Sequence, residues 1–125
     1  MRLFVISASI SGALAVLLGA FGAHALKNMI SAEMLEVYKT GVQYHFYHTF
    51  ALLFVGLIGY FQQSKTLKWS GWLFSAGIFL FSGSLYLLAV TGLKIIGIIT
   101  PFGGLCFVAG WVCLGLHASK NFKSV

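Results

Sequence analysis

Four long apolar stretches constrain the fold of this 125-residue chain more than any other feature. They cover about residues 3–25, 42–61, 69–90 and 101–118, and none of them contains an Asp, Glu, Lys or Arg. An α-helix needs about 20 mainly apolar residues to cross the hydrocarbon core of a bilayer. The sequence therefore predicts a single all-α domain, an antiparallel bundle of four transmembrane helices.

The overall composition argues against a soluble protein. Hydrophobic residues make up 59% of the chain and charged residues 8%, whereas roughly a quarter of the residues in soluble domains are charged. A soluble domain this short has too little interior to bury so much apolar surface. The net charge of +6 comes from single cations outside the apolar stretches and not from a basic patch. We therefore expect the lipid bilayer, and not nucleic acid, as the partner.

The first apolar stretch resembles a signal peptide, with Arg2 before it and Ala23-His24-Ala25 at its end. Its apolar core of about 20 residues exceeds the ~7–15 of a signal peptide, so we expect a retained helix. Small residues recur at every fourth position, which lets another helix approach closely. This row predicts a place at the bundle centre or at a seam with a second copy or a membrane protein partner. Its members are Ser7, Ser11, Ala15, Gly19 and Ala23.

The polar stretch that follows predicts a short amphipathic helix at the membrane surface, over about residues 31–41. Ser31 is a suitable N-cap, and Glu33 and Glu36 lie near the positive end of such a helix. We expect an interfacial connector, with a moving lid over the bundle mouth as the alternative.

The last apolar stretch contains the only proline, Pro101, which fits the first turn of a helix, and Thr100 before it is a suitable cap. We expect a helix from Pro101 to about Ala118. A helix that starts near Ile95 and kinks at the proline is the alternative.

Polar side chains converge at one end of the predicted bundle, where the first and third helices end and the second and fourth begin. Because polar groups are costly in lipid, they turn inward and pair with one another. We predict a polar pocket at this end, with a purely structural hydrogen-bonded plug as the alternative. The candidate residues are His24, Gln43, Tyr44, His48, Ser82, Tyr86 and Thr100. His117 lies at the opposite end, where we expect it to reach water.

Histidines in this pocket raise the question of a metal or haem. His24 and His48, with His45 as a weaker third ligand, suit zinc, copper or iron, and two histidines can ligate haem. A structural zinc site wants four ligands, so no cofactor is the main expectation. A proton path through histidine and tyrosine is a further alternative. No nucleophile–base–acid set is present, and we do not expect an enzyme.

The cations indicate how the chain is oriented. Five fall on one side of the predicted membrane, namely Arg2, Lys65, Lys68, Lys120 and Lys123, and three on the other, namely Lys27, Lys39 and Lys94. Both acidic residues belong to the second side. Because cytoplasmic loops carry the excess of Lys and Arg, both termini are predicted to be cytoplasmic and the pocket to face outward.

Four motifs carry a resemblance to a known family. They are Gly19-Ala20-Phe21-Gly22-Ala23-His24, Tyr47-His48, Phe81-Ser82-Gly83-Ser84-Leu85-Tyr86 and Ile99-Thr100-Pro101-Phe102-Gly103-Gly104. The chain resembles the bacterial family of domain of unknown function 423 and is similar to the transmembrane protein 256 group. The resemblance implies a multi-pass plasma-membrane protein of four helices and no known activity. His24 and His48 match the family pattern, whereas His45 stands where a glutamine is usual.

These observations lead to three hypotheses about function. The first is a small binding or transport component with a polar pocket. The second is a structural or accessory membrane subunit without a ligand, and the third is a metal- or haem-binding membrane protein.

Overall fold

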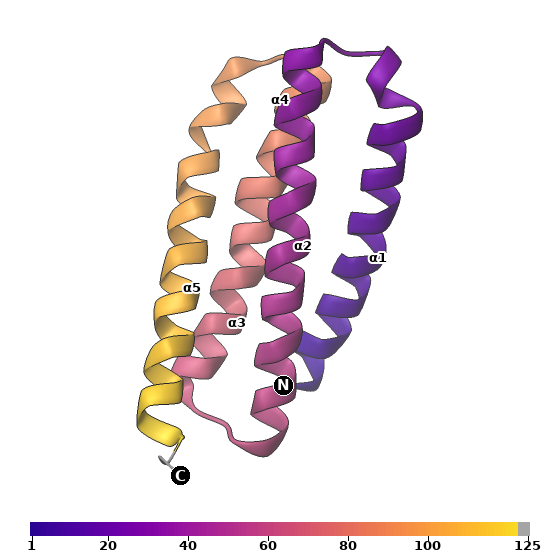
Figure 1. Ribbon diagram of the computed structural model, residues 1–125. Helices are drawn as coiled ribbons and strands as arrows, with labels where there is room; N and C mark the ends of the chain where they lie inside the picture. The colour runs from indigo at the N-terminus through magenta and orange to yellow at the C-terminus, as the bar shows by residue number, and fades with distance from the viewer. Residues whose placement is uncertain (123–125) are drawn as a thin grey trace.

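The computed structural model describes residues 1–122, and every regular element in this range is a helix. The elements are α1 (Arg2–His24), η1 (Leu26–Asn28), α2 (Ala32–Phe61), α3 (Lys65–Gly77), η2 (Ile78–Ser82), α4 (Gly83–Thr91), η3 (Lys94–Ile98) and α5 (Thr100–Asn121). The long helices stand side by side, and the chain reverses direction at each connection between them (Figure 1). The all-α prediction is therefore confirmed.

Three helical segments are long and apolar enough to cross a membrane: Arg2–Asn28, Lys65–Thr91 and Lys94–Asn121. The second of these joins α3, η2 and α4 into one continuous rod. It begins at Lys65, before the predicted start at Trp69, because the Ser64 hydroxyl accepts a hydrogen bond from the Leu67 amide at 3.0 Å and caps the helix.

A single helix replaces the expected surface helix and second span. α2 runs without a break over 30 residues, and Ser31 caps it as predicted, with the Met34 amide 3.2 Å from its hydroxyl oxygen. The prediction of a separate amphipathic helix was wrong, because α2 continues without interruption past residue 41. Gly41 lies inside α2, where the Tyr86 ring packs against it.

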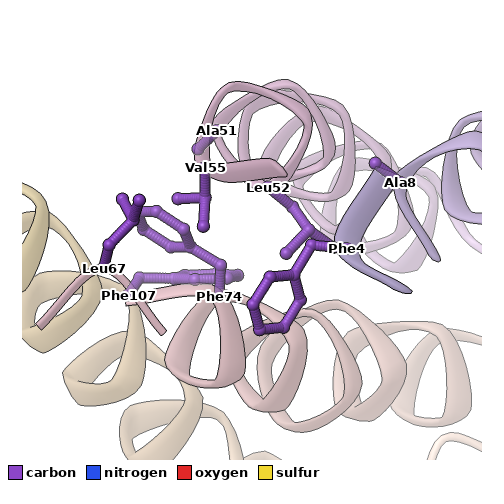
Figure 2. Close-up of a cluster of buried hydrophobic side chains, with 8 residues drawn as sticks. All are labelled: Phe4, Ala8, Ala51, Leu52, Val55, Leu67, Phe74 and Phe107. Atoms are coloured by element: carbon purple, nitrogen blue, oxygen red, sulfur yellow. The ribbon is translucent and has the colours of Figure 1, made fainter. Parts of the chain in front are cut away.

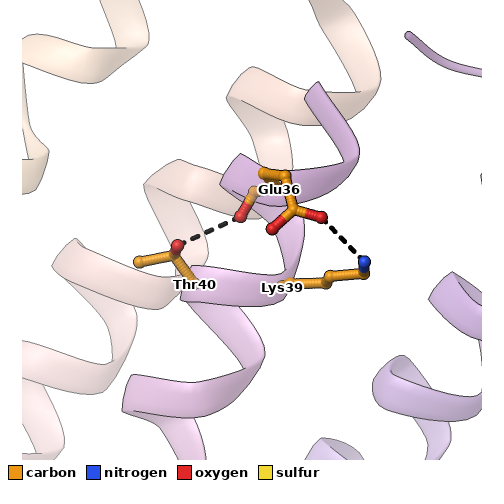
Figure 3. Close-up of polar contacts among 3 residues, drawn as sticks. All are labelled: Glu36, Lys39 and Thr40. Atoms are coloured by element: carbon orange, nitrogen blue, oxygen red, sulfur yellow. Dashed lines mark hydrogen bonds and ion pairs between the residues drawn. The ribbon is translucent and has the colours of Figure 1, made fainter. Parts of the chain in front are cut away.

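The first turns of α2 have an exposed face and a buried face. On the exposed side, Lys39 Nζ donates to Glu36 Oε1 at 2.7 Å, and the Thr40 hydroxyl donates to the Glu36 carbonyl at 3.0 Å (Figure 3). On the packed side, Tyr38 is buried, and its hydroxyl donates to the Leu18 carbonyl at 2.5 Å. This part of α2 therefore packs against α1 instead of lying free on a membrane surface.

The middle of the small-residue row of α1 faces α2 of the same chain. Within the row, Gly19 contacts Val42 and Ala15 is completely buried. Beside the row, Gly12 contacts Thr49 and Gly22 lies under the Tyr38 ring. A close helix approach, as predicted from the row, therefore occurs within one chain, at the side of the bundle (Figure 1). A seam with a second copy through this row stays a prediction.

The main apolar core lies in the half of the molecule near the α2–α3 connection. Side chains from α1, α2, α3 and α5 meet there (Figure 2): Phe4, Ala8, Ala51, Leu52, Val55, Leu67, Phe74 and Phe107. In lipid, such helix contacts are stabilised by close packing and not by removal of apolar surface from water. Glycines make the packing possible, since Gly77 faces the Phe107 ring and Gly110 faces the Phe74 ring.

α5 starts as predicted and ends later than predicted. Pro101 stands in its first turn, but the Thr100 side chain makes no cap, because its hydroxyl bonds to the Ser84 hydroxyl at 2.6 Å. The helix continues to Asn121, whereas Lys123 lies outside the described residues.

His117, near the end of α5, is completely buried, so the expectation that it reaches water was wrong. Its Nδ1 lies 2.7 Å from the Ser64 hydroxyl, which holds the ring against the α2–α3 connection.

Candidate functional site

A hydrogen-bonded chain centred on His45 connects three helices. His45 Nδ1 lies 2.9 Å from the Tyr86 hydroxyl of α4, and His45 Nε2 lies 2.9 Å from the Ser11 hydroxyl of α1. The Ser11 hydroxyl also lies 2.6 Å from the Thr49 hydroxyl of α2. His45 and Thr49 are buried, at 4% and 5% exposure. The four side chains form what we call the His45 chain.

Helix geometry and small residues explain why these groups meet. His45 and Thr49 are four residues apart and therefore share one face of α2. The glycines of α1 allow this helix close to α2, which brings Ser11 within hydrogen-bond distance. Gly41, one turn before His45, leaves room for the Tyr86 ring, and the Tyr38 ring lies 5.1 Å from the Tyr86 ring.

A cavity of about 410 Å³ lies beside the His45 chain, between α1 and the α3–η2–α4 rod. Its polar lining comes from five side chains: Ser7, Ser11, His45, Ser75 and Tyr86. The other lining residues are apolar or aromatic, among them Trp72 and Phe79, and none is charged. We call this cavity the α1–α4 groove.

The groove exists because α1 packs on α2 and meets the α3–η2–α4 rod mainly at one end. There the Phe4 ring contacts the Trp72 ring edge-on, with centroids 5.4 Å apart, and covers Gly71. Further along the rod, Gly83 lines the groove, and a Cβ added to it would meet no atom within 4 Å.

The rod has a π-helical turn beside the groove. The turn covers Ile78–Ser82, and Gly103 of α5 packs directly against the backbone of Phe81 within it. Single π turns inside α-helices are frequent at functional sites. The Ser82 hydroxyl is buried in this turn and has no hydrogen-bond partner in the described part of the chain.

His48 lies on a different side of α2 and faces α5. Its ring stacks on Phe107 with centroids 3.4 Å apart and planes 6° apart. Nδ1 donates to the Tyr44 carbonyl at 2.8 Å, so Nε2 is the acceptor for the Trp111 indole N–H at 3.3 Å. Both ring nitrogens are therefore occupied by protein groups.

The structure distributes the seven candidate pocket residues over several places. His24 is exposed at the end of α1, and Gln43 is exposed and donates to the Tyr47 hydroxyl at 2.7 Å. Tyr44 is 38% exposed and packs on Phe81. Ser82 is buried in the π-helical turn, and Thr100 bonds to the Ser84 hydroxyl. His48 lies against α5. Only Tyr86 belongs to the His45 chain.

His45 and Ser11 are the residues that sequence reasoning undervalued. The departure of His45 from the family pattern counted against it, although its spacing from Thr49 and the small-residue row at Ser11 were visible in the sequence. Within residues 1–122, no three His, Cys, Asp or Glu side chains are placed to hold a metal ion.

Within residues 1–122, an all-helical fold with three segments long and apolar enough to cross a bilayer defines the class of multi-pass membrane proteins. Residues 18–104 match the model of the family described as "Protein of unknown function (DUF423)", and the chain belongs to this family. The predicted family relationship is thus confirmed.

Curated relatives are similar over nearly the whole chain. UPF0382 membrane protein YwdK of Bacillus subtilis is 46% identical over 121 residues, which are 96% of this chain and 98% of the relative. A UPF0382 membrane protein of Staphylococcus aureus is 46% identical over 120 residues, which are 96% and 98% of the two chains. One of Staphylococcus saprophyticus is 46% identical over 120 residues, with 96% and 99% covered. No solved structure matches the chain.

Proposed function

We propose that this membrane protein crosses the plasma membrane with four helices and binds a small, uncharged, lipid-soluble molecule in the α1–α4 groove. The observation that carries the proposal is a cavity of about 410 Å³ with an uncharged, mainly apolar lining and the buried His45 chain at its side. Small-molecule sites combine apolar walls with a few converging polar groups in this way.

The burial pattern of α2 supports its role as the fourth span. Residues 42–61 contain no charged side chain. His45, His48 and Thr49 are buried against other helices, whereas Phe50 and Phe54 are exposed. Gln43, near the start of this range, is exposed, and its amide is paired with the Tyr47 hydroxyl at 2.7 Å. Polar side chains that are buried or paired, with apolar side chains outside, suit a helix that spans a bilayer.

The charge distribution supports cytoplasmic termini. The start of α1, the end of α5 and the α2–α3 connection lie at one end of the molecule (Figure 1), and the cations there within residues 1–122 are Arg2, Lys65, Lys68 and Lys120. Both acidic residues, Glu33 and Glu36, lie at the opposite end. An excess of Lys and Arg marks the cytoplasmic side.

A cavity-filling substitution tests the groove. Gly83→Leu introduces a side chain into it, whereas Gly115→Leu is a matched control on α5, where a Cβ also meets nothing within 4 Å and no groove is lined. Both variants and the parent chain are purified from membranes in mild detergent, and organic extracts are compared by mass spectrometry. We expect a neutral compound that co-purifies in about equal molar amount with the parent and with Gly115→Leu, and that is absent from Gly83→Leu. Equal extracts from all three proteins would contradict the proposal.

A structural or accessory subunit is the second candidate, and complete pairing of His48 favours it. Both nitrogens of this ring are bonded within the chain, as expected of a group that only holds helices together. In that case Gly83→Leu folds with unchanged or higher thermal stability, and no compound distinguishes the three extracts.

A further inference from the structure

The His45 chain contains one more donor hydrogen than it can use. The Ser11, Thr49 and Tyr86 hydroxyls and the neutral His45 imidazole each carry one polar hydrogen, which gives four. Only three hydrogen bonds join these four side chains. Since the imidazole N–H lies on a bonded nitrogen in either tautomer, the unused hydrogen belongs to one of the three hydroxyls.

The position of that hydrogen matters because a buried donor without an acceptor destabilises the folded protein. Thr49 is 5% exposed, does not line the groove and has no other hydrogen-bond partner within residues 1–122. Ser11 and Tyr86 both line the groove. The chain is therefore completed when its free hydrogen lies on Ser11 or Tyr86 and an acceptor occupies the groove.

A second hydroxyl in the groove also lacks a hydrogen-bond acceptor within the described residues. Ser7 lines the groove one turn before Ser11, is half-buried and makes no side-chain hydrogen bond within the described residues. Lysine, arginine and carboxylate side chains are absent from the lining, so nothing there compensates a charge on a ligand. The groove thus suits an uncharged acceptor.

The position of the groove along the bilayer normal narrows the class of ligand further. Ser11, which lines the groove, is the tenth of the 23 residues of α1, which places it roughly 14 Å from one end of the helix and roughly 20 Å from the other. The hydrocarbon core of a bilayer is about 30 Å thick, so this part of the groove lies near its middle. The polar headgroups of phospholipids stay at the interface, whereas the acceptor must belong to a molecule that dissolves in hydrocarbon.

From these observations, and resting on the proposed function, we infer that the α1–α4 groove binds a quinone with an apolar tail. A quinone ring is flat and uncharged and carries two opposed carbonyl acceptors. One carbonyl accepts from the Tyr86 hydroxyl at the end of the His45 chain and the other from Ser7. Trp72 and Phe79 contact the ring, and the tail passes between α1 and the rod into the bilayer. The inference concerns binding only and assigns no redox step.

The test measures binding of a benzoquinone with a ten-carbon alkyl tail to the full chain in lipid nanodiscs. Decylbenzene, with the same tail and no carbonyls, is the control ligand. We expect saturable binding of the quinone alone. Tyr86→Phe, which keeps the ring that packs on Gly41, weakens binding about five- to tenfold because one hydrogen bond to the ligand is lost. Tyr47→Phe, at an exposed tyrosine of α2, leaves binding unchanged.

A serine pair gives an independent comparison. Ser7→Ala removes a hydroxyl in the groove and weakens binding about three- to tenfold. Ser9→Ala removes an exposed hydroxyl that bonds only to the Val5 carbonyl of its own helix, and leaves binding unchanged. These substitutions are small, so gel filtration confirms folding before each titration.

Equal binding of quinone and decylbenzene, or quinone affinities of Tyr86→Phe and Ser7→Ala equal to that of the parent, would overturn the inference. If a different compound co-purifies in a Gly83-dependent manner and the quinone does not bind, the ligand class is wrong and the groove function stands. If Gly83→Leu and Gly115→Leu give the same extracts as the parent, the groove function itself has failed.

Discussion

The two sides of α2 are held to their neighbours in different ways. On the side of α1 and α4, contacts include the hydrogen bonds of the His45 chain and leave a cavity of about 410 Å³. On the side of α3 and α5, the rings of His48, Phe74, Phe107 and Trp111 pack on one another and on glycines. Two histidines three residues apart thus have opposite surroundings. The α1–α4 side places paired polar groups beside its groove, whereas the hollow of about 740 Å³ beside His48 on the other side has an almost entirely apolar lining.

The strongest test of the packed side is Gly103→Leu. A Cβ at this position would overlap the backbone of Phe81 in the π-helical turn, and backbone cannot move aside as a flexible side chain can. Because overpacking costs 1–3 kcal/mol or more, we expect a loss of at least about 3 kcal/mol of stability, or failure to fold. Thermal unfolding in detergent measures the effect against Gly115→Leu, and equal midpoints for the two variants would disprove the tight α5 contact.

A smaller loss of stability is expected when the hydrogen bonds between α1 and α2 are removed at Ser11. Ser11→Ala removes two hydrogen bonds and leaves His45 Nε2 and the Thr49 hydroxyl without their partner. The cost is about 1–3 kcal/mol, because buried polar groups lose their pairing. Ser9→Ala, two residues earlier and exposed, is the control and should cost less than about 0.5 kcal/mol. Similar unfolding midpoints for both variants would mean that the hydrogen bonds do not hold α1.

The smallest effect on stability is expected at the ion pair of Lys39 and Glu36, which belongs to neither side of α2. The two side chains are 60% and 71% exposed, so water screens their 2.7 Å contact. Lys39→Ala should lower the unfolding free energy by less than about 0.5 kcal/mol, which sets the baseline for the other two comparisons. A loss as large as that of Ser11→Ala would show that the first turns of α2 contribute more than their exposure indicates.

Much of the fold followed from physical constraints that act along the sequence. The length of the apolar stretches indicated the number of long helices and the approximate bounds of all of them except α2, which begins at Ala32 and not near residue 42. Local chemistry placed Ser31 as a cap and Pro101 in a first turn, because both effects depend on neighbouring residues alone.

The site was predictable only in part, because it depends on which faces of helices meet. Placing polar groups by their position along each helix put His24 in the pocket, but its side chain is exposed at the end of α1. The same reasoning missed Ser11, whose small size allows close helix approach while its hydroxyl bonds to His45. The π-helical turn also escaped prediction; it lies where Gly103 of α5 packs against the Phe81 backbone, a tertiary contact that the local sequence does not reveal.

The order of contacts along the chain has a consequence for assembly. α1 packs chiefly on α2, and the rod of α3, η2 and α4 packs on α5, so the chain forms two hairpins of consecutive long helices. Ser64 lies where the two hairpins join and bonds to His117 of the last helix. A chain inserted from its N-terminus can therefore complete the first hairpin before the second is synthesised. Local pairing of this kind favours rapid folding.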